Sequence, residues 1–538
     1  MNKKNALTKE QIHAFSKPIL EDMTYRLLIQ VDELNEKVSE LSEAVNVLKG
    51  NEFGRHTEKQ EEMPPCFNES EVITDEATEE EKAEPTLSDL NPLNSDEPLE
   101  AVKKAHAKGR RTDDLKALPV KQEPYRLTEE QKTCECGGTF REINSPGVTH
   151  RLVFKPAEMY VEEQLIYSYK CDRCGKLVRA DHPLPVFEGS LATPSLLAGI
   201  ATAKFSNAST YYRLENGFAS NCAFLSRQTM ARWMIRTADV YFSLIVDRMK
   251  QELLSCGVIH ADETTVEVSK DGRSAGAKSY MWVYTKEGSE RPVVIYEYQK
   301  TRAATHPKEF LADYIGWLCC DGYEAYHSLP DSIRICGCWA HARRHYANAV
   351  KALSGNADRV TELAVSQQAL QTIGEMLHLE EEWKTLSREE HLIKRKTVMK
   401  EKIDSYYQWI GSVIDAVPPK SETGKGLRYS LNQKDYLLAF LENPDVPMDN
   451  SEAERKIRNF VISRKNFILI DTVSGAEASA VMFSMSETAR ANHLNPYAWY
   501  EYLLTELPKH LNQKSKDMSF LDDLMPWSEK LPEGIRKN

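Results

Sequence analysis

Three acidic residues, Asp262, Asp321 and Glu454, stand where their carboxylates could meet and hold divalent metal ions. Asp262 ends an apolar run that begins at Gly257, and Asp321 ends a second run, Trp317–Asp321. Two converging carboxylates repel each other unless a cation lies between them, and Mg²⁺ or Mn²⁺ prefers such oxygen ligands. Two ions about 3.5–4 Å apart can activate an attacking hydroxyl and stabilise the leaving oxygen on phosphorus. The three acids therefore predict a two-metal site for phosphoryl transfer.

The third acid lies in a run that begins at Met448 with helix-capping residues and continues as a helix. Glu452, two residues before Glu454, points to a different helix face and is the alternative third ligand. Taken alone, either aspartate is more simply a strand-terminal or turn residue, whereas three acids on this order of elements favour a shared site. A lone acid among basic residues suits a metal ligand that faces a polyanion. The basic residues predicted to bind DNA here are Arg455, Arg458, Arg464 and Lys465.

The elements that must position these acids follow a recognisable order. Strand-like runs at 257–262, 280–284 and 293–298 precede a helix predicted at 307–314, the strand ending at Asp321 and a further strand at 333–338. This is the order expected of a ribonuclease-H-like sheet, in which Asp262 and Asp321 lie on neighbouring strands at one sheet edge. We expect an α/β catalytic core over 256–475, with a helical insertion at about 342–440.

Between the second and third acids lies the run Cys338-Trp-Ala-His341, closely followed by three more basic or histidine residues. One interpretation places His341 near a scissile phosphate, with Cys338 supporting the site and Arg343 or Arg344 on a DNA backbone. A zinc site built from Cys336, Cys338, His341 and His345 is an alternative. A third interpretation is purely structural: the cysteine and tryptophan of this run pack in the core, and the arginines face solvent.

Two close cysteine pairs, each followed by glycine, predict a zinc-ribbon-like module over 125–190 that binds DNA. The second pair, Cys171 and Cys174, has the usual two-residue gap. The first pair, Cys134 and Cys136, encloses a single residue, which strains chelation by both thiolates, and His150 is a substitute ligand. The alternative is a set of reduced, metal-free thiols.

The N-terminal segment, 1–56, carries apolar residues at alternating spacings of four and three from Leu27 to Leu48. Valine at a and leucine at d favour a parallel two-stranded coiled coil, although an amphipathic helix packed on its own protein would show the same pattern. Residues 57–124 are predicted to be a disordered acidic tether that ends in a basic run. Fifteen acidic residues against two lysines at 58–100 account for the chain's net charge of −12. That charge therefore does not exclude a nucleic-acid partner.

The remaining segments are predicted to be helical. Ser226 suits the N-cap of a basic helix within 191–255, which could read DNA as part of a helix-turn-helix or could serve as a scaffold. A C-terminal helical segment is expected at 476–538. The predicted fold class is multidomain α+β: a coiled coil, a zinc-ribbon-like module and a ribonuclease-H-like core with a helical insertion.

Several segments resemble the insertion-sequence-66 family of bacterial transposases, nearly throughout the chain and in the expected order. They are HADETTVEV, WLCCDGYEAYHSL, CGCWAHARRHY and DNSEAERKIRNFVISRKNF, together with NEFGRHTEK, the two cysteine knuckles, HLNPYAWYEYLLTELP and LMPWSEKLP. The resemblance implies a DDE mechanism with Asp262, Asp321 and Glu454 as ligands of Mg²⁺ or Mn²⁺. The Cys338-x-x-His341 block is similar to one found between the second and third acids of several transposase families. The shortened Cys134/Cys136 spacing departs from the family pattern.

The function implied by this resemblance is that of a transposase acting on an insertion sequence. It would bind the terminal inverted repeats, cleave the 3′ ends by two-metal hydrolysis and join them to target DNA. A homodimer or higher oligomer and accessory proteins of the same element are the expected partners. One alternative is a transposase-derived DNA-binding protein without catalysis, against which the presence of all three acids argues. Another alternative is a metallohydrolase that acts on small molecules. That function would leave the predicted coiled coil and zinc-ribbon-like module without a role.

Membrane proteins and secreted proteins are not expected from this sequence. It holds no run of about 18 apolar residues that could span a bilayer. The first residues, MNKKNALTKEQIHAF, lack the apolar core of a signal peptide. We therefore expect no membrane association and a cytoplasmic, nucleoid-associated bacterial protein.

Overall fold

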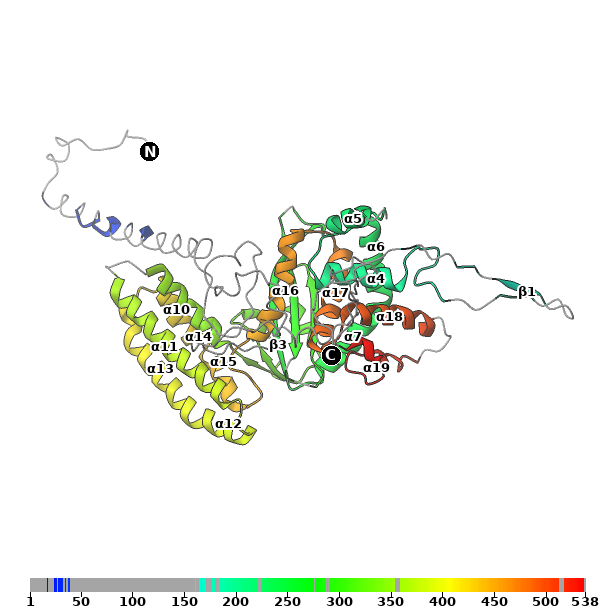
Figure 1. Cartoon of the computed structure of the whole chain (residues 1–538). Coiled ribbons are helices and arrows are strands. Elements are labelled where there is room, and N and C mark those ends of the chain that lie inside the picture. The colour runs from blue at the N-terminus through cyan, green and yellow to red at the C-terminus, as the bar shows by residue number, and fades with distance from the viewer. Residues whose placement is uncertain are drawn as a thin grey trace, which may run out of the picture. The chain divides into compact units, whose positions relative to one another are not determined.

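The structure is a computed structural model (Figure 1). It describes residues 183–536, except 221–223, 275, 287, 289, 354–358 and 512–516, together with scattered positions within 17–38 and 160–179. The four cysteines of the predicted zinc ribbon, the acidic tether and most of the predicted coiled-coil seam lie outside the described residues. Within the described part of the chain, no helix combines the length and apolar character needed to cross a membrane.

A mixed β-sheet forms the centre of the described structure. Its main strands run in the spatial order β5-β4-β3-β6-β7, and β8 pairs separately with the far end of β3. The first three strands in sequence are antiparallel neighbours, whereas β6 and β7 are added parallel to β3. The strands are β3 (Val258–Lys270), β4 (Lys278–Lys286), β5 (Val293–Gln299), β6 (Gly316–Cys319), β7 (Ile333–Cys336) and β8 (Ile470–Thr472).

Strand β3 continues well beyond Asp262, so the prediction that the strand ends at this aspartate was wrong. The residues after it include Thr264, Thr265 and Val266, whose β-branched side chains favour a pleated strand. This extension pairs with β4 as far as Glu267 and then with β8 at Val268. The extension therefore provides a surface for helix α16 (Ser451–Phe467), which packs on β3 and β4.

The outer edge of strand β5 is covered by helix α17 (Val473–Ala491) rather than by another strand. The Ser484 hydroxyl accepts a hydrogen bond from the Tyr296 amide at 2.8 Å. The Thr488 hydroxyl accepts from the Val294 amide at 3.0 Å and donates to the same residue's carbonyl at 2.9 Å. An open edge would leave these groups available for pairing with another chain. A ladder of small polar side chains on α17 thus closes the sheet.

We predict that Ser484→Ala destabilises the fold by about 1–3 kcal/mol, because it leaves the buried Tyr296 amide without an acceptor. The change in free energy of unfolding can be measured by chemical denaturation followed by tryptophan fluorescence. Ser479→Ala on the same helix is the matched control, since the Ser479 hydroxyl donates only to the Gly475 carbonyl one turn earlier. Equal effects of the two substitutions would contradict a role of α17 in closing the edge.

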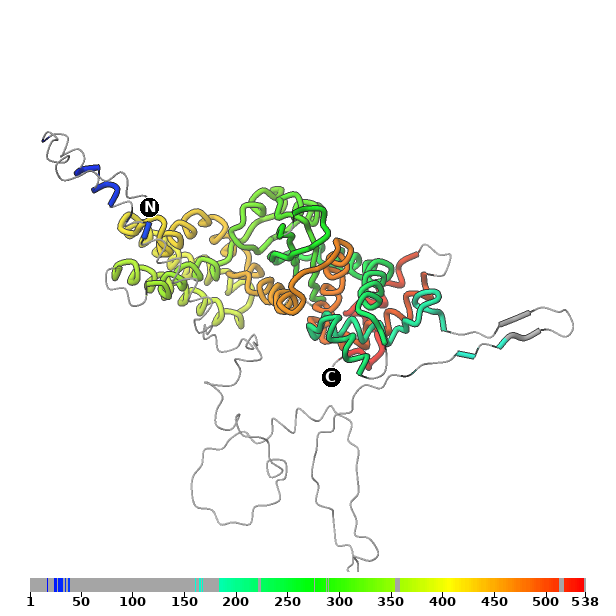
Figure 2. The backbone as a smooth tube through the Cα atoms, turned by 90° about the horizontal axis from the view of Figure 1, so that it is seen from above, coloured from blue at the N-terminus to red at the C-terminus, as the bar shows by residue number. Residues whose placement is uncertain are grey.

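A helical module separates β7 from α16 in the sequence, as expected for the stretch at about 342–440. Its buried residues, including Trp339, Tyr406 and Leu437, form a hydrophobic cluster distinct from that of the sheet. Figure 2 follows the chain as it leaves the sheet through these helices and returns in α16. The helices are α10 (Trp339–Leu353), α11 (Val360–Trp383), α12 (Arg388–Lys394), α13 (Lys400–Val413), α14 (Glu422–Asn432) and α15 (Lys434–Leu438).

Helices that precede and follow the core in the sequence complete the described structure. Ser226 is the N-cap of α6 and accepts from the Thr229 amide at 3.2 Å, as predicted. Met230 and Met234 of this helix are buried, while Arg227 and Arg232 remain exposed. The helices are α4 (Pro194–Ala201), α5 (Tyr211–Ser220), α6 (Arg227–Thr237), α7 (Ser243–Leu254), α18 (Pro496–Leu511) and α19 (Leu521–Leu524).

The helix predicted at 307–314 begins and ends earlier, as α8 (Thr305–Phe310). Pro307 falls within its first turn, where backbone N–H groups have no intrahelical partner, so proline is tolerated there. A second short helix, α9 (Glu324–His327), follows β6.

Candidate active site

The parallel pairing of β3 with β6 brings Asp262 and Asp321 to the same edge of two neighbouring strands. The register places His260 opposite Cys319, and each aspartate follows two residues later. Asp321 accepts a hydrogen bond from the Tyr323 amide at 2.9 Å, and Asp262 accepts one from the Glu263 amide at 2.8 Å. Each carboxylate is therefore held by local backbone while its remaining lone pairs stay available for a cation.

Asn450 connects helix α16 to this edge. Its side chain is 1% exposed, lies 2.9 Å from His260 Nδ1 and donates to the Ala261 carbonyl at 2.8 Å. Its backbone amide donates to Cys338 Sγ at 3.1 Å. Asn450 is the N-cap residue of α16 by position, but its side chain does not cap the helix. It instead fixes the start of α16 against β3 and the Cys338 block.

Glu454 is held at this end of α16 by two residues of helix α10. Arg344 Nη2 donates to Glu454 Oε2 at 2.7 Å, and His341 Nδ1 lies 3.3 Å from Glu454 Oε1. Arg344 Nη1 also lies 3.1 Å from His341 Nε2. The acid predicted as third ligand and the predicted Cys338-x-x-His341 block therefore meet in space.

Cys338, His341 and Glu454 form the single group in the described part of the chain whose possible metal-binding atoms all lie within 4.8 Å of one another. Cys336 and His345 do not belong to it, so the structure does not assemble the four-residue zinc site considered above. Asp262 and Asp321 lie outside this compact group. The structure therefore does not place the three acids in one compact ligand group.

The electrostatics of Asp262 show that the acids influence one another. Burial raises the pKa of Asp262 well above its usual range, and the negative charges of Glu263, Asp321 and Glu454 raise it further. Like charges around a partly buried carboxyl disfavour its ionised form unless a cation compensates them. Glu454 Oε1 is buried and receives no hydrogen bond. The raised pKa of Asp262 and the buried Glu454 oxygen that receives no hydrogen bond fit a hard divalent cation such as Mg²⁺ or Mn²⁺.

Glu452, the alternative third ligand, also faces the sheet. Its Oε2 lies 3.8 Å from His260 Nε2, and its side chain is 15% exposed. It therefore sits against the residue that Asn450 also contacts, whereas Glu454 faces His341 and Arg344. The structure gives the two glutamates different neighbours, which makes their roles separable by substitution.

Glu263 was missed by sequence reasoning, although it directly follows Asp262. Its side chain is 1% exposed. It accepts hydrogen bonds from Arg302 Nε and from the Tyr326 hydroxyl, both at 2.7 Å. Arg302 Nη2 lies 4.0 Å from Asp321 Oδ2, and the guanidinium stacks 3.6 Å from the Tyr323 ring centroid. Alternation along the strand points Glu263 to the face opposite Asp262. The sequence around Glu263 does not indicate that Arg302 is its partner.

The predicted DNA-binding residues of α16 divide into two groups. Arg458 and Lys465 follow Glu454 by four and eleven residues, a spacing that keeps them near one face of a helix. Both are exposed, as is Arg455. Arg464 instead donates to the Thr265 carbonyl and thus ties α16 to β3. On α10, Arg344 is exposed and Arg343 is partly buried.

Comparison with known families explains this arrangement. A model described as "Transposase IS66 family" matches residues 189–478, more than half of the chain, and "IS66 C-terminal element" matches 484–527. The chain belongs to the IS66 transposase family. The first match includes every residue of the candidate active site, and it confirms the family expected from the sequence segments. By family, this chain is a transposase.

Curated relatives from Sinorhizobium fredii are similar over most of their length. The uncharacterized protein y4qI is 24% identical over 515 residues, which is 93% of this chain and 90% of the relative. The uncharacterized protein y4jD is 26% identical over 419 residues, covering 75% of this chain and 79% of the relative. The similarity to y4qI extends the relationship of this IS66 transposase beyond the region that the family models match.

Proposed function

We propose that this IS66 transposase cleaves and joins DNA with two divalent cations held by Asp262, Asp321 and Glu454. It would bind the terminal inverted repeats of its insertion sequence, hydrolyse the phosphodiester at the 3′ ends and join the freed hydroxyls to target DNA. What supports this proposal is that β3 pairs with β6, that α16 packs on β3, and that the charges of Asp321 and Glu454 both raise the pKa of Asp262.

The strand order supports a ribonuclease-H-like core. If the sheet strands are counted from β3, their spatial order is 3-2-1-4-5, with the first three antiparallel and the last two parallel to the first. In such a sheet the first and fourth strands are neighbours, and here they carry Asp262 and lead into Asp321. This pairing supports the proposal of a ribonuclease-H-like core.

The cations, when bound, would activate the attacking oxygen and stabilise the leaving oxygen. The chain itself must orient the ligands and the DNA. Asn450 fixes the start of α16 and with it the position of Glu454, whose charge acts on Asp262. Arg344 holds Glu454 and is half exposed, which places a guanidinium where a phosphate oxygen would approach. Positioning and charge compensation of this kind supply most of the catalysis in phosphoryl transfer.

We further propose that DNA follows the exposed cationic face of α16. Arg458 and Lys465 continue from Glu454 along one side of that helix, with Arg455 and Arg343 beside it. Such residues contact phosphates and contribute affinity without sequence selectivity. Arg464 is better explained as a link between α16 and β3 than as a DNA contact.

Assembly through the N-terminal segment remains part of the proposal. Val31, Leu34 and Val38 belong to the predicted seam and are 49%, 61% and 64% exposed. A parallel coiled coil with a second copy would bury these side chains, and a dimer would let two copies hold two element ends. Accessory proteins encoded by the same element are proposed as further partners.

The zinc-ribbon-like module is proposed to bind one structural Zn²⁺ through Cys134, Cys136, Cys171 and Cys174. We predict about one zinc per chain by elemental analysis, and its loss in the double variant Cys171→Ser/Cys174→Ser, because a structural site needs its thiolates. Cys256→Ser is the control, since Cys256 lies outside the two pairs. Full zinc content in the double variant would contradict the ribbon.

An end-cleavage assay tests the central proposal. The chain is incubated with Mg²⁺ and a duplex that carries the element's terminal repeat, and nicked and joined products are separated on a denaturing gel. Nicks at the repeat boundary support the proposal. Specific binding without nicking would instead favour a transposase-derived DNA-binding protein.

A further inference from the structure

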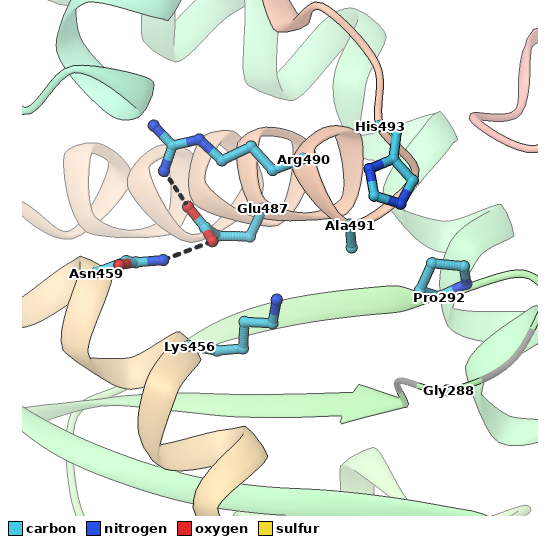
Figure 3. A pocket seen from close by; sticks show the side chains of 8 residues that line it. All are labelled: Gly288, Pro292, Lys456, Asn459, Glu487, Arg490, Ala491 and His493. Atoms are coloured by element: carbon cyan, nitrogen blue, oxygen red, sulfur yellow. Dashed lines mark hydrogen bonds and ion pairs between the residues drawn. The ribbon is translucent and has the colours of Figure 1, made fainter. Parts of the chain in front are cut away.

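A pocket of about 550 Å³ lies between α16, α17 and the hairpin that joins β4 to β5. Figure 3 shows that Lys456 and Asn459 reach it from α16, whereas Glu487 and Arg490 reach it from α17. His493 lies at its rim, just after the end of α17. The volume falls within the range of about 300–1,000 Å³ typical of small-ligand sites. The mechanism proposed above does not use this pocket.

The single carboxylate among the lining residues is engaged with neighbouring side chains. Glu487 is 2% exposed and accepts from Asn459 Nδ2 at 2.7 Å and from Arg490 Nη1 at 2.9 Å. Arg490 also donates to the Ser206 carbonyl, and 37% of its side chain remains exposed. The ammonium group of Lys456 points into the space between the two helices (Figure 3). The lining therefore offers more cationic donors than acidic acceptors, which selects for an anion.

The backbone at His493 ends helix α17, where the Leu494 amide donates to the Ala489 carbonyl at 2.9 Å. Its φ is 57°, in the left-handed region that glycine or asparagine usually occupies at the end of a helix. A histidine in this conformation costs the fold backbone strain that a glycine would avoid. Here the conformation leaves the imidazole exposed beside the pocket.

The pocket lies across α16 from the candidate active site. Lys456 follows Glu454 by two residues, which separates the two side chains by about 200° around the helix. Tyr296 anchors this side of the helix, because its hydroxyl donates to the Lys456 carbonyl at 2.6 Å. A helix is about 10–12 Å across, so about one helix diameter separates the pocket from Glu454.

We propose that this pocket binds a phosphodiester group of DNA through Lys456, Arg490 and His493, a short distance along the strand from the reacting phosphate. The inference rests on the proposed function, since it presumes that DNA occupies the adjacent site. The phosphate could belong to the element end or to target DNA, and both sources present the same oxyanion.

The test measures DNA binding by fluorescence anisotropy, with the full chain and no Mg²⁺, over a series of salt concentrations. The probes are a duplex with the terminal repeat and a duplex of unrelated sequence that represents target DNA. We expect Lys456→Ala to weaken binding about tenfold. We also expect it to reduce the slope of log affinity against log salt by about 0.9, as for the loss of one phosphate contact. Lys509→Ala is the matched control, because Lys509 is an exposed lysine of α18 that pairs with Glu506.

His493→Gly separates a binding role from a structural one. Glycine adopts a positive φ without strain, so the melting temperature should stay equal or rise while DNA affinity falls. His493→Asn should behave similarly, since asparagine also accepts this backbone conformation. A lower melting temperature with unchanged affinity would assign His493 a purely structural role and count against the proposal.

Methylphosphonate substitution, which removes the charge of one phosphate at a time, identifies the contact. At one position it should weaken wild-type binding about tenfold and weaken Lys456→Ala no further. A position on the repeat duplex alone identifies the element end, and one on both duplexes identifies a contact that target DNA shares. If every position affects the variant as much as the wild type, the pocket does not hold a phosphate.

The two proposals fail in different ways. Binding of the duplex without cleavage in Mg²⁺ overturns the proposed function, while the phosphate contact is still decided by the anisotropy data. Normal cleavage with pocket variants that match Lys509→Ala overturns only the pocket. A wild-type chain that binds neither duplex overturns both.

Discussion

Asp262→Asn should abolish end cleavage, with a loss of about 10³-fold or more, while DNA affinity stays within a few-fold of the wild type. An amide is a much poorer ligand for a hard divalent cation than a carboxylate is. The DNA contacts proposed on α16 lie elsewhere and should persist. The measurement is the rate of nicking of a terminal-repeat duplex in Mg²⁺, with affinity determined separately.

The same variant should change how the chain responds to metal. In chelator, Asp262→Asn should melt at a higher temperature than the wild type, because it removes a charge that burial and three neighbouring acids disfavour. Addition of Mg²⁺ or Mn²⁺ should raise the melting temperature of the wild type, since a ligand that binds the folded state stabilises it. The variant should show a much smaller rise.

Asp321→Asn provides a second carboxylate variant, and Asp471→Asn provides a control. Asp471 is an exposed acid whose Oδ2 lies 2.7 Å from Nζ of Lys270, at the far end of β3. Its replacement should leave both cleavage and metal stabilisation intact. Equal metal stabilisation of wild type, Asp262→Asn and Asp321→Asn would refute metal binding at this edge.

The strands beside two of the acids could be predicted because their signals are local, although β3 does not end at Asp262. Each aspartate closes or interrupts a short apolar run. Parallel pairing of those runs places the two aspartates side by side on neighbouring strands. The length of β3 was missed because its second half alternates polar and β-branched residues, so that apolar content alone did not mark it. The helical content after β7 was likewise readable from its sequence.

The contacts that complete the site join residues distant in sequence, and no local pattern reports them. Asn450 and His260 are 190 residues apart, and Arg302 is 39 residues from Glu263. The sequence predicted helix-capping residues in the run that begins at Met448, which includes Asn450, because asparagine usually caps a helix that follows it. In the fold, the side-chain amide of Asn450 instead contacts the ring of His260 and donates to the buried carbonyl of Ala261. Glu454 was selected from its basic surroundings and family resemblance, and only the fold supplies its two partners on α10.

Glu454→Gln should reduce cleavage by about 10³-fold, whereas Glu452→Gln should retain most of it. We expect this difference because the charge of Glu454 raises the pKa of Asp262, which shows that Glu454 lies within electrostatic reach of Asp262. Glu452 Oε2 lies 3.8 Å from His260 Nε2, so we expect Glu452 to support the start of α16. The two variants are isosteric with the wild type and lie on the same helix turn, so each serves as the other's control. Both rates are measured on the same duplex in saturating Mg²⁺.

A further variant shows how Glu454 is held. Arg344→Lys keeps a positive charge near Glu454 but loses the planar guanidinium that contacts both Glu454 and His341. It should reduce the rate of cleavage more than DNA affinity if Arg344 orients the acid. If Glu452→Gln abolishes cleavage while Glu454→Gln retains it, the ligand set is Asp262, Asp321 and Glu452. His341 and Arg344 would then serve to hold Glu454 in a structural ion pair.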